Sequence, residues 1–140
     1  MANFDFAYNL DGSNSTPVKK KFPVAATQTL LVGDLVELSS GKIAKCGDAT
    51  PRVFGVMAED SSSAAAGTLV QVYVAQPGQV WRAIADADAT THVLAGRAYD
   101  INVTTQTVDV GDAAAGCIQI VELGSANTDV YVAFTAFELA

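Results

Sequence analysis

The stretch Val70–Ala83, "VQVYVAQPGQVWRA", decides the predicted fold. In its first half valines alternate with other side chains, which is typical of a β-strand with one apolar face. Pro77 and Gly78 suit the middle positions of a type II turn, because proline fixes φ and glycine tolerates a positive φ. A second strand can follow the turn. The pattern therefore predicts a β-hairpin, and no residue near it is an evident reactive group.

The composition of the chain indicates a single domain whose surface binds other protein subunits. The chain has 140 residues, of which 50% are hydrophobic and 16% are charged, and its mean hydropathy is +0.27. Globular proteins average about 25% charged residues. So little charge favours a surface partly covered by other subunits. A large, alanine-rich core is the alternative.

The charge balance excludes several classes of partner. The net charge is −7 and the pI is about 4.4, whereas nucleic-acid-binding modules carry basic patches. The only basic cluster is Lys19–Lys21, which is either a solvated tether or a contact for an acidic partner surface.

No apolar run approaches the roughly 18 residues of a membrane span, and the start lacks the features of a signal peptide. Cys46 and Cys117 form no CxxC motif, which favours buried free thiols in a reducing cytosol.

The first 23 residues differ from the rest of the chain. Phe4, Phe6 and Tyr8 alternate with other residues, and a polar loop and the lysine run follow. We expect residues 1–23 to form an extended N-terminal arm and residues 24–140 to form a single β domain. The aromatic strand either packs on its own domain or adds to the sheet edge of a neighbour.

The remaining sequence is almost entirely of β type, and in its second half we expect strands near residues 98–103, 107–110, 117–123 and 130–137. Turn signals recur about every 8–12 residues, which is typical of a sandwich or barrel. Only residues 83–96, "AIADADATTHVLAG", resemble a helix, and we expect a loop there with at most one helical turn. The segment 32–59 can also be laid on 95–122, so that Gly33 matches Gly96 and Leu38 matches Ile101. A duplication and shared hairpin chemistry both account for this similarity.

No motif points to catalysis, a metal or a cofactor. His92 is the only histidine and has no nucleophile pattern beside it, and the carboxylates at 86 and 88 and at 109 and 112 lack the spacing of a calcium loop. Phosphate-binding glycine motifs are absent from the sequence. We therefore expect no enzyme activity. A structural subunit that binds a large protein surface is favoured over a carbohydrate- or small-ligand-binding β module, because the aromatic residues are spread out.

Two segments resemble a known family. Residues 32–60 contain "GDLVELSSGK" and "FGVMAED", and residues 70–83 contain "PGQVWRA". This order resembles the capsid cement, or head decoration, proteins of tailed bacteriophages, over about residues 30–84. The motifs are turn and strand patterns and carry no chemistry.

The resemblance implies an all-β fold, a small barrel or β-tulip-like domain. It implies a homotrimer that binds the major capsid protein on the outside of the head, stabilises the shell, and contacts neither DNA nor membrane. The protein would be made in the cytoplasm of the host bacterium. A tail-tube or minor shell subunit is the alternative. On this interpretation the residues expected to contact the capsid or a neighbouring subunit are Phe4, Phe6 and Tyr8, followed by Trp81 and Arg82.

Overall fold

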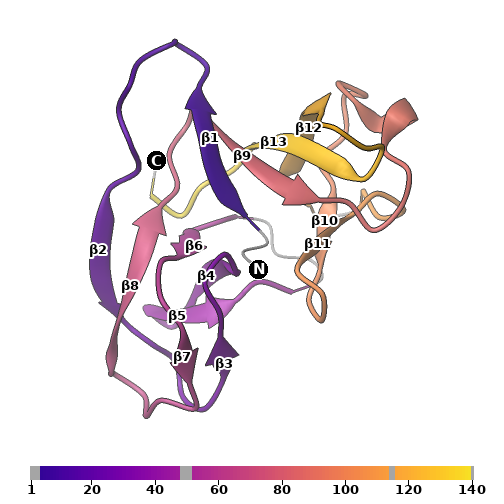
Figure 1. Cartoon of the computed structure of the whole chain (residues 1–140). Helices are drawn as coiled ribbons and strands as arrows, with labels where there is room; N and C mark the ends of the chain where they lie inside the picture. The colour runs from indigo at the N-terminus through magenta and orange to yellow at the C-terminus, as the bar shows by residue number, and fades with distance from the viewer. Residues whose placement is uncertain (1–3, 48–51, 114–115, 140) are drawn as a thin grey trace.

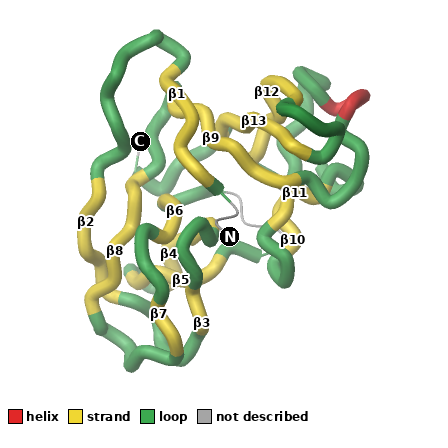
Figure 2. The backbone as a smooth tube through the Cα atoms, in the orientation of Figure 1, coloured by secondary structure: helices red, strands yellow, loops and turns green. Residues whose placement is uncertain are grey.

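The protein is an all-β molecule with two lobes (Figures 1 and 2). The computed structural model describes residues 4–47, 52–113 and 116–139. Within these ranges the only helical element is a single 3-10 turn at Thr90–His92, inside the segment expected to be a loop. No helix in this part of the chain has the length and apolar character of a membrane span.

The N-terminal lobe is built on a five-stranded antiparallel sheet, drawn at the lower left of Figure 1. Its strand order is β2-β8-β6-β4-β5, and a ribbon of β3 and β7 lies at one end. The strands are β2 (Lys19–Pro23), β3 (Thr29–Leu30), β4 (Leu35–Ser39), β5 (Lys42–Lys45), β6 (Gly55–Met57), β7 (Ser61–Ser62) and β8 (Leu69–Val74).

The C-terminal lobe contains a four-stranded antiparallel sheet and a two-stranded ribbon. The sheet order is β1-β9-β13-β12, the ribbon is β10-β11, and an isolated bridge from Tyr99 to Ile118 joins the two. The strands are β1 (Asp5–Asn9), β9 (Gln79–Ile84), β10 (Asp100–Asn102), β11 (Thr107–Asp109), β12 (Ile118–Leu123) and β13 (Asp129–Phe134).

The predicted hairpin at Val70–Ala83 is wrong, although both strands and the turn exist. Gly78 has φ +86, as a type II turn requires, and the Gln79 N–H donates to the Gln76 carbonyl at 3.3 Å. However, β8 pairs with β2 and β6, whereas β9 pairs with β1 and β13. Each strand already has two partners, so neither has an edge left for the other. The turn carries the chain from the N-terminal lobe to the C-terminal lobe.

The predicted barrel and extended arm are not confirmed. None of the sheets is closed into a barrel. An isolated parallel bridge between Val24 and Ile43 brings the edge strands of the N-terminal sheet together at one end only. Within residues 1–23, β1 adds to the C-terminal lobe and β2 adds to the N-terminal lobe. The first described residues are therefore edge strands of the fold, joined by a loop.

The two lobes repeat one plan of strand pairing. The order β2-β8-β6-β4-β5 in the first lobe matches β9-β13-β12-β10-β11 in the second, where the Tyr99–Ile118 bridge replaces the β4–β6 ladder. The register matches as well. Phe22 pairs with Val70 in the first lobe, and Ala83 pairs with Val130 in the second.

Backbone hydrogen bonds outside the strands repeat in the same places. The Phe54 N–H donates to the Val36 carbonyl at 2.9 Å, and the Cys117 N–H donates to the Tyr99 carbonyl at 3.1 Å. Gly33 and Gly96, matched by sequence, both have positive φ, +89 and +72. Similar hairpin turns alone do not fix long-range register, so the likeness of the two halves extends to their tertiary structure.

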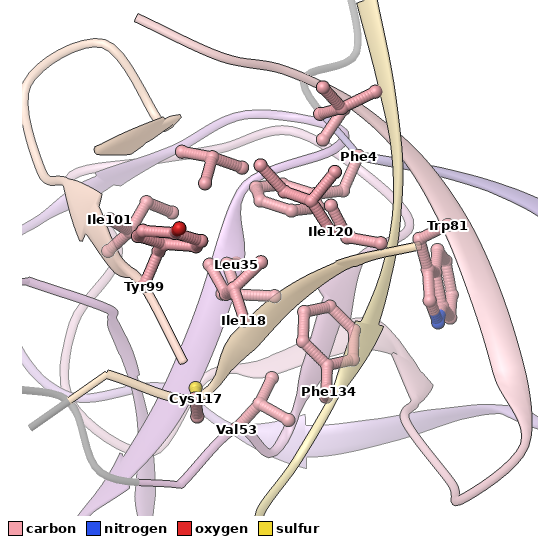
Figure 3. Packing of buried hydrophobic residues seen from close by; sticks show 14 of the residues in the cluster. Phe4, Leu35, Val53, Trp81, Tyr99, Ile101, Cys117, Ile118, Ile120 and Phe134 are labelled. Atoms are coloured by element: carbon pink, nitrogen blue, oxygen red, sulfur yellow. The ribbon is translucent and has the colours of Figure 1, made fainter. Parts of the chain in front are cut away.

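One large hydrophobic core lies between and within the lobes (Figure 3), and a smaller one lies inside the N-terminal lobe. Gln106 is buried beside the large core and ties the lobes together. Its amide oxygen accepts the Leu35 N–H at 2.8 Å, and its amide nitrogen donates to the carbonyls of Cys46 at 3.3 Å and Val103 at 3.2 Å. The large core includes Phe4, Leu35, Val53, Val56, Trp81, Tyr99, Ile101, Ile118, Ile120, Val130, Val132 and Phe134.

Candidate interaction surface

The five residues predicted to make contacts lie together at the paired strands β1 and β9. Asp5 pairs with Arg82 and Phe6 pairs with Trp81. Sequence patterns could not predict this pairing, because the two strands are far apart along the chain. The five residues divide into a group that faces the core and a group that faces outward.

The core-facing residues hold β1 against its own sheet. Phe4 and Trp81 are each only 1% exposed. The Phe6 ring meets Trp81 edge-on at 5.6 Å between centroids, and Phe4 packs on Phe134 at 6.0 Å. Such aromatic pairs add to the stabilisation from burial. Phe4 and Trp81 therefore offer no surface to a partner in this conformation, and Phe6 is half-buried.

Tyr8 and Arg82 face outward, and the structure adds residues that sequence reasoning missed. The Tyr8 ring lies 6.3 Å from that of Tyr131 on β13. Around them is a hollow of about 470 Å³, which we call the β1–β13 surface. Its lining residues are Asp5, Phe6, Ala7, Tyr8, Arg82, Glu122 and Tyr131.

Hydrogen bonds fix the orientation of the Tyr8 side chain. Its hydroxyl donates to Glu122 Oε2 at 2.6 Å. This hydrogen bond, together with partial burial and the negative charge of Glu122, raises the pKa of Tyr8 to about 12. The phenol is thus neutral at physiological pH and serves as a fixed donor.

The Arg82 guanidinium is held by Asp129 in a two-pronged contact. Its Nε and one terminal nitrogen each donate to a different carboxylate oxygen at 2.8 Å. The contact lowers the pKa of Asp129 and raises the pKa of Arg82. The Arg82 side chain is 52% exposed and that of Asp129 is 8% exposed. The two hydrogen bonds to Asp129 therefore fix the guanidinium of Arg82, which still faces solvent.

The turn between β12 and β13 is shaped around the same carboxylate. The Ser125 N–H and hydroxyl both donate to Asp129 Oδ2, at 3.1 and 3.2 Å. A Cβ built on Gly124 would lie 2.3 Å from that oxygen, so a larger residue would displace the carboxylate. Asp129 therefore positions both the turn and Arg82.

The single histidine and the loop carboxylates make local contacts within the fold. His92 Nδ1 lies 2.7 Å from the hydroxyl of Tyr99, whose side chain is buried. Burial raises the pKa of Asp109, and the nearby negative charge of Asp86 raises it further. Among the residues with described structure, no group of three or more histidine, cysteine, aspartate or glutamate side chains is arranged to hold a metal ion.

The two cysteines are buried, as predicted. Cys46 and Cys117 form no disulfide, and burial raises the pKa of the Cys117 thiol to about 12. A thiol with such a pKa stays protonated and is a poor nucleophile.

Neither protein-family models nor curated protein sequences match this chain.

The missed residues had a partial signal in the sequence. Tyr131 stands between two valines in β13, so strand alternation places it on the face opposite the core. Glu122 and Asp129 had no such signal, because their roles depend on which strand lies beside them. On the β1–β13 surface, hydrogen bonds hold Tyr8, Glu122 and Arg82 in fixed orientations.

Proposed function

We propose that this protein is a non-catalytic structural subunit of a tailed-phage virion. It would bind the major capsid protein on the outer surface of the head as a homotrimer and stabilise the shell without contacting DNA. In this proposal the β domain as a whole corresponds to the small barrel or β-tulip-like domain of the head decoration proteins.

The observation that carries the proposal is the β1–β13 surface. Tyrosine and arginine are enriched in protein–protein interfaces. Here Tyr8, Tyr131 and Arg82 lie on one sheet, and hydrogen bonds to carboxylates hold Tyr8 and Arg82 in place. Groups that are already ordered lose little entropy on binding.

The resemblance to decoration proteins supports the same proposal. The matching segments, residues 32–60 and 70–83, supply β4, β5, β6, β8 and β9, the last of which carries Arg82. Low charge and a net charge of −7 suit a protein partner better than DNA. Many identical sites on a head would multiply a modest affinity per subunit.

The test is cosedimentation with empty heads of the phage whose genome encodes this chain, together with the mass in solution by light scattering. We expect a trimer that adds to the heads. Tyr131→Ala should weaken head binding by about tenfold, because an aromatic anchor is lost. Leu69→Ala is the matched control, since Leu69 is 58% exposed on the other lobe.

Two results would contradict the proposal. One is a monomer at high concentration that leaves the heads bare. The other is equal head binding by the Tyr131→Ala and Leu69→Ala variants, which would remove the β1–β13 surface from the contact.

A further inference from the structure

The lobes differ at one edge, and the difference marks a second binding site. In the C-terminal lobe β1 covers the outer edge of β9. The matching strand of the N-terminal lobe is β2, which ends the sheet order of that lobe. No described strand pairs with its outer edge along Lys19–Lys21. We call this edge the β2 edge.

Backbone geometry shows which groups the β2 edge presents. The Val74 N–H donates to the Val18 carbonyl, and the Val24 N–H donates to the Thr68 carbonyl, both at 2.9 Å. Because hydrogen bonding alternates along an antiparallel pair, the backbone of Lys20 faces β8. The N–H and carbonyl groups of Lys19 and Lys21 therefore face outward.

The covered edge of the C-terminal lobe serves as a template. There the Ala85 N–H donates to the Thr128 carbonyl at 2.8 Å, which leaves the backbone of Arg82 facing β1. By register Arg82 matches Lys21, since Lys21 pairs with Gln71 as Arg82 pairs with Tyr131. The residue across from Arg82 is the acidic Asp5.

Further along, both edges are occupied in the same way. The Ala25 N–H donates to the Ile43 carbonyl of β5 at 2.8 Å, and the Asp86 N–H donates to the Val108 carbonyl of β11 at 3.0 Å. The two lobes thus agree up to this point. At this edge they differ in the strand that covers the preceding residues, since β1 covers β9 and no described strand covers β2.

Charge indicates what would cover the β2 edge. In the C-terminal lobe, Trp81 of β9 lies opposite Phe6 of β1. In the N-terminal lobe, Lys20 of β2 occupies the position that matches Trp81. An apolar pair in one lobe therefore corresponds in the other to an exposed cation, whose charge would favour an acidic residue across from it. Lys19, Lys20 and Lys21 are all exposed.

We propose that the β2 edge binds an extended acidic segment of another protein chain, which adds as an antiparallel strand beside Lys19–Lys21. The backbone of the β2 edge supplies hydrogen bonds and the lysines select carboxylates. This site lies on a different lobe from the β1–β13 surface and does not depend on head binding.

The test uses a synthetic peptide with the sequence of residues 4–10 in which Phe6 is replaced by Glu. Asp5 and this Glu would then lie across from Lys21 and Lys20. We expect the peptide to shift the amide resonances of Lys19 and Lys21 in the full chain and to slow their hydrogen exchange, and we expect salt to weaken the effect. A peptide with lysine at positions 5 and 6 is the control and should produce no shift.

Two variants separate the backbone from the charge. Lys21→Pro removes one outward N–H at an edge position that tolerates proline, and it should weaken peptide binding by about tenfold or more. Lys21→Gln keeps the N–H and should weaken binding by only about threefold. Spectra of β8 report whether each variant is folded.

The wild-type experiment can overturn the proposal without any variant. Unchanged Lys19 and Lys21 amides would mean that the lysines only guard the edge against strand addition. Shifts confined to the amides of β9 would mean that the peptide displaces β1 instead. Either result, or equal binding by a folded Lys21→Pro variant, rejects the site.

Discussion

The two lobes pair their strands in the same register but differ at one edge. In the C-terminal lobe β1 covers the edge of β9, whereas no described strand covers the matching edge of β2 in the N-terminal lobe. Trp81 in β9 and Lys20 in β2 occupy matching places, yet Trp81 is 1% exposed and Lys20 is exposed. The cause is β1, which lays Phe6 against Trp81. The comparison teaches that the same backbone position takes an aromatic residue where another strand covers it and a lysine where none does.

A second difference lies in the turn of each inner hairpin. In the N-terminal lobe Ser40 and Gly41, with φ +50 and +79, make a tight two-residue turn. In the C-terminal lobe the turn spans residues 103–106 and ends at Gln106, whose φ is +54. The longer turn lets Gln106 reach the first lobe, so the repeat is broken where the two halves meet.

The comparison predicts its largest effect at the matched pair Trp81 and Lys20. Trp81→Ala should lower the free energy of unfolding by about 3–5 kcal/mol, since it empties a core site. Lys20→Ala should change it by less than about 0.5 kcal/mol. Denaturant titration of both variants measures the contrast. Comparable losses would show that the two edges are equally packed.

The tryptophan also allows a milder variant. Its indole Nε1 is buried and has no hydrogen-bond partner in the described structure. Trp81→Phe keeps most of the ring and removes this unpaired donor, so it should cost about 1 kcal/mol or less. A loss as large as that of Trp81→Ala would show that the indole itself is required.

Gly55 should give the next largest effect, because it lies where strands of the N-terminal lobe come closest. A Cβ built there would be 2.1 Å from the Tyr73 carbonyl oxygen. Its counterpart by register in the other lobe, Ile118, carries a full side chain. We expect Gly55→Ala to cost about 3 kcal/mol. As control, Gly12→Ala meets open space at φ +77 and should cost about 1 kcal/mol. Equal melting temperatures for the two variants would contradict this.

Gln106 tests whether the broken repeat joins the lobes. Gln106→Leu removes the acceptor of the Leu35 N–H and the donor to the Cys46 carbonyl, at a cost of about 2 kcal/mol. Thr105→Ala in the same turn is exposed and should cost less than about 0.5 kcal/mol. Hydrogen exchange at Leu35 should become faster only in the Gln106 variant.

The smallest effect concerns Tyr8, which covers the edge that the other lobe leaves open. Its pKa is raised from 10.0 to about 12 in the folded protein. The stabilisation linked to this shift is therefore full below about pH 10 and is lost as the pH rises towards 12. Ultraviolet titration of tyrosine should show this late ionisation, and Glu122→Gln should shift it to lower pH. A Tyr8 that ionises near pH 10 in the wild type would contradict the hydrogen bond.

The sequence predicted local structure well. The expected strands near residues 98–103, 107–110 and 117–123 occur as β10, β11 and β12. In the loop expected at residues 83–96, the first two residues belong to the end of β9, and the only helical element is the 3-10 turn. Alternation and turn residues act over a few neighbours, so one sequence carries enough information to place them.

The candidate site could be predicted only in part. Tyr8 and Arg82 were identified and do lie on one surface, whereas Phe4 and Trp81 were expected at a contact and are core residues. An aromatic residue at a strand position is compatible with both roles. The choice depends on whether another strand lies over it, which the linear pattern does not record.

The sequence by itself determined that the chain is β, where its strands and turns fall, and that its halves follow a similar plan. Only the tertiary structure decided which strands pair, since it separated β8 from β9 and placed β1 beside β9. The physical reason is that every strand edge offers the same backbone donors and acceptors. Pairing is therefore selected by the packing of whole faces against the core, and the short sequence between two strands does not select it.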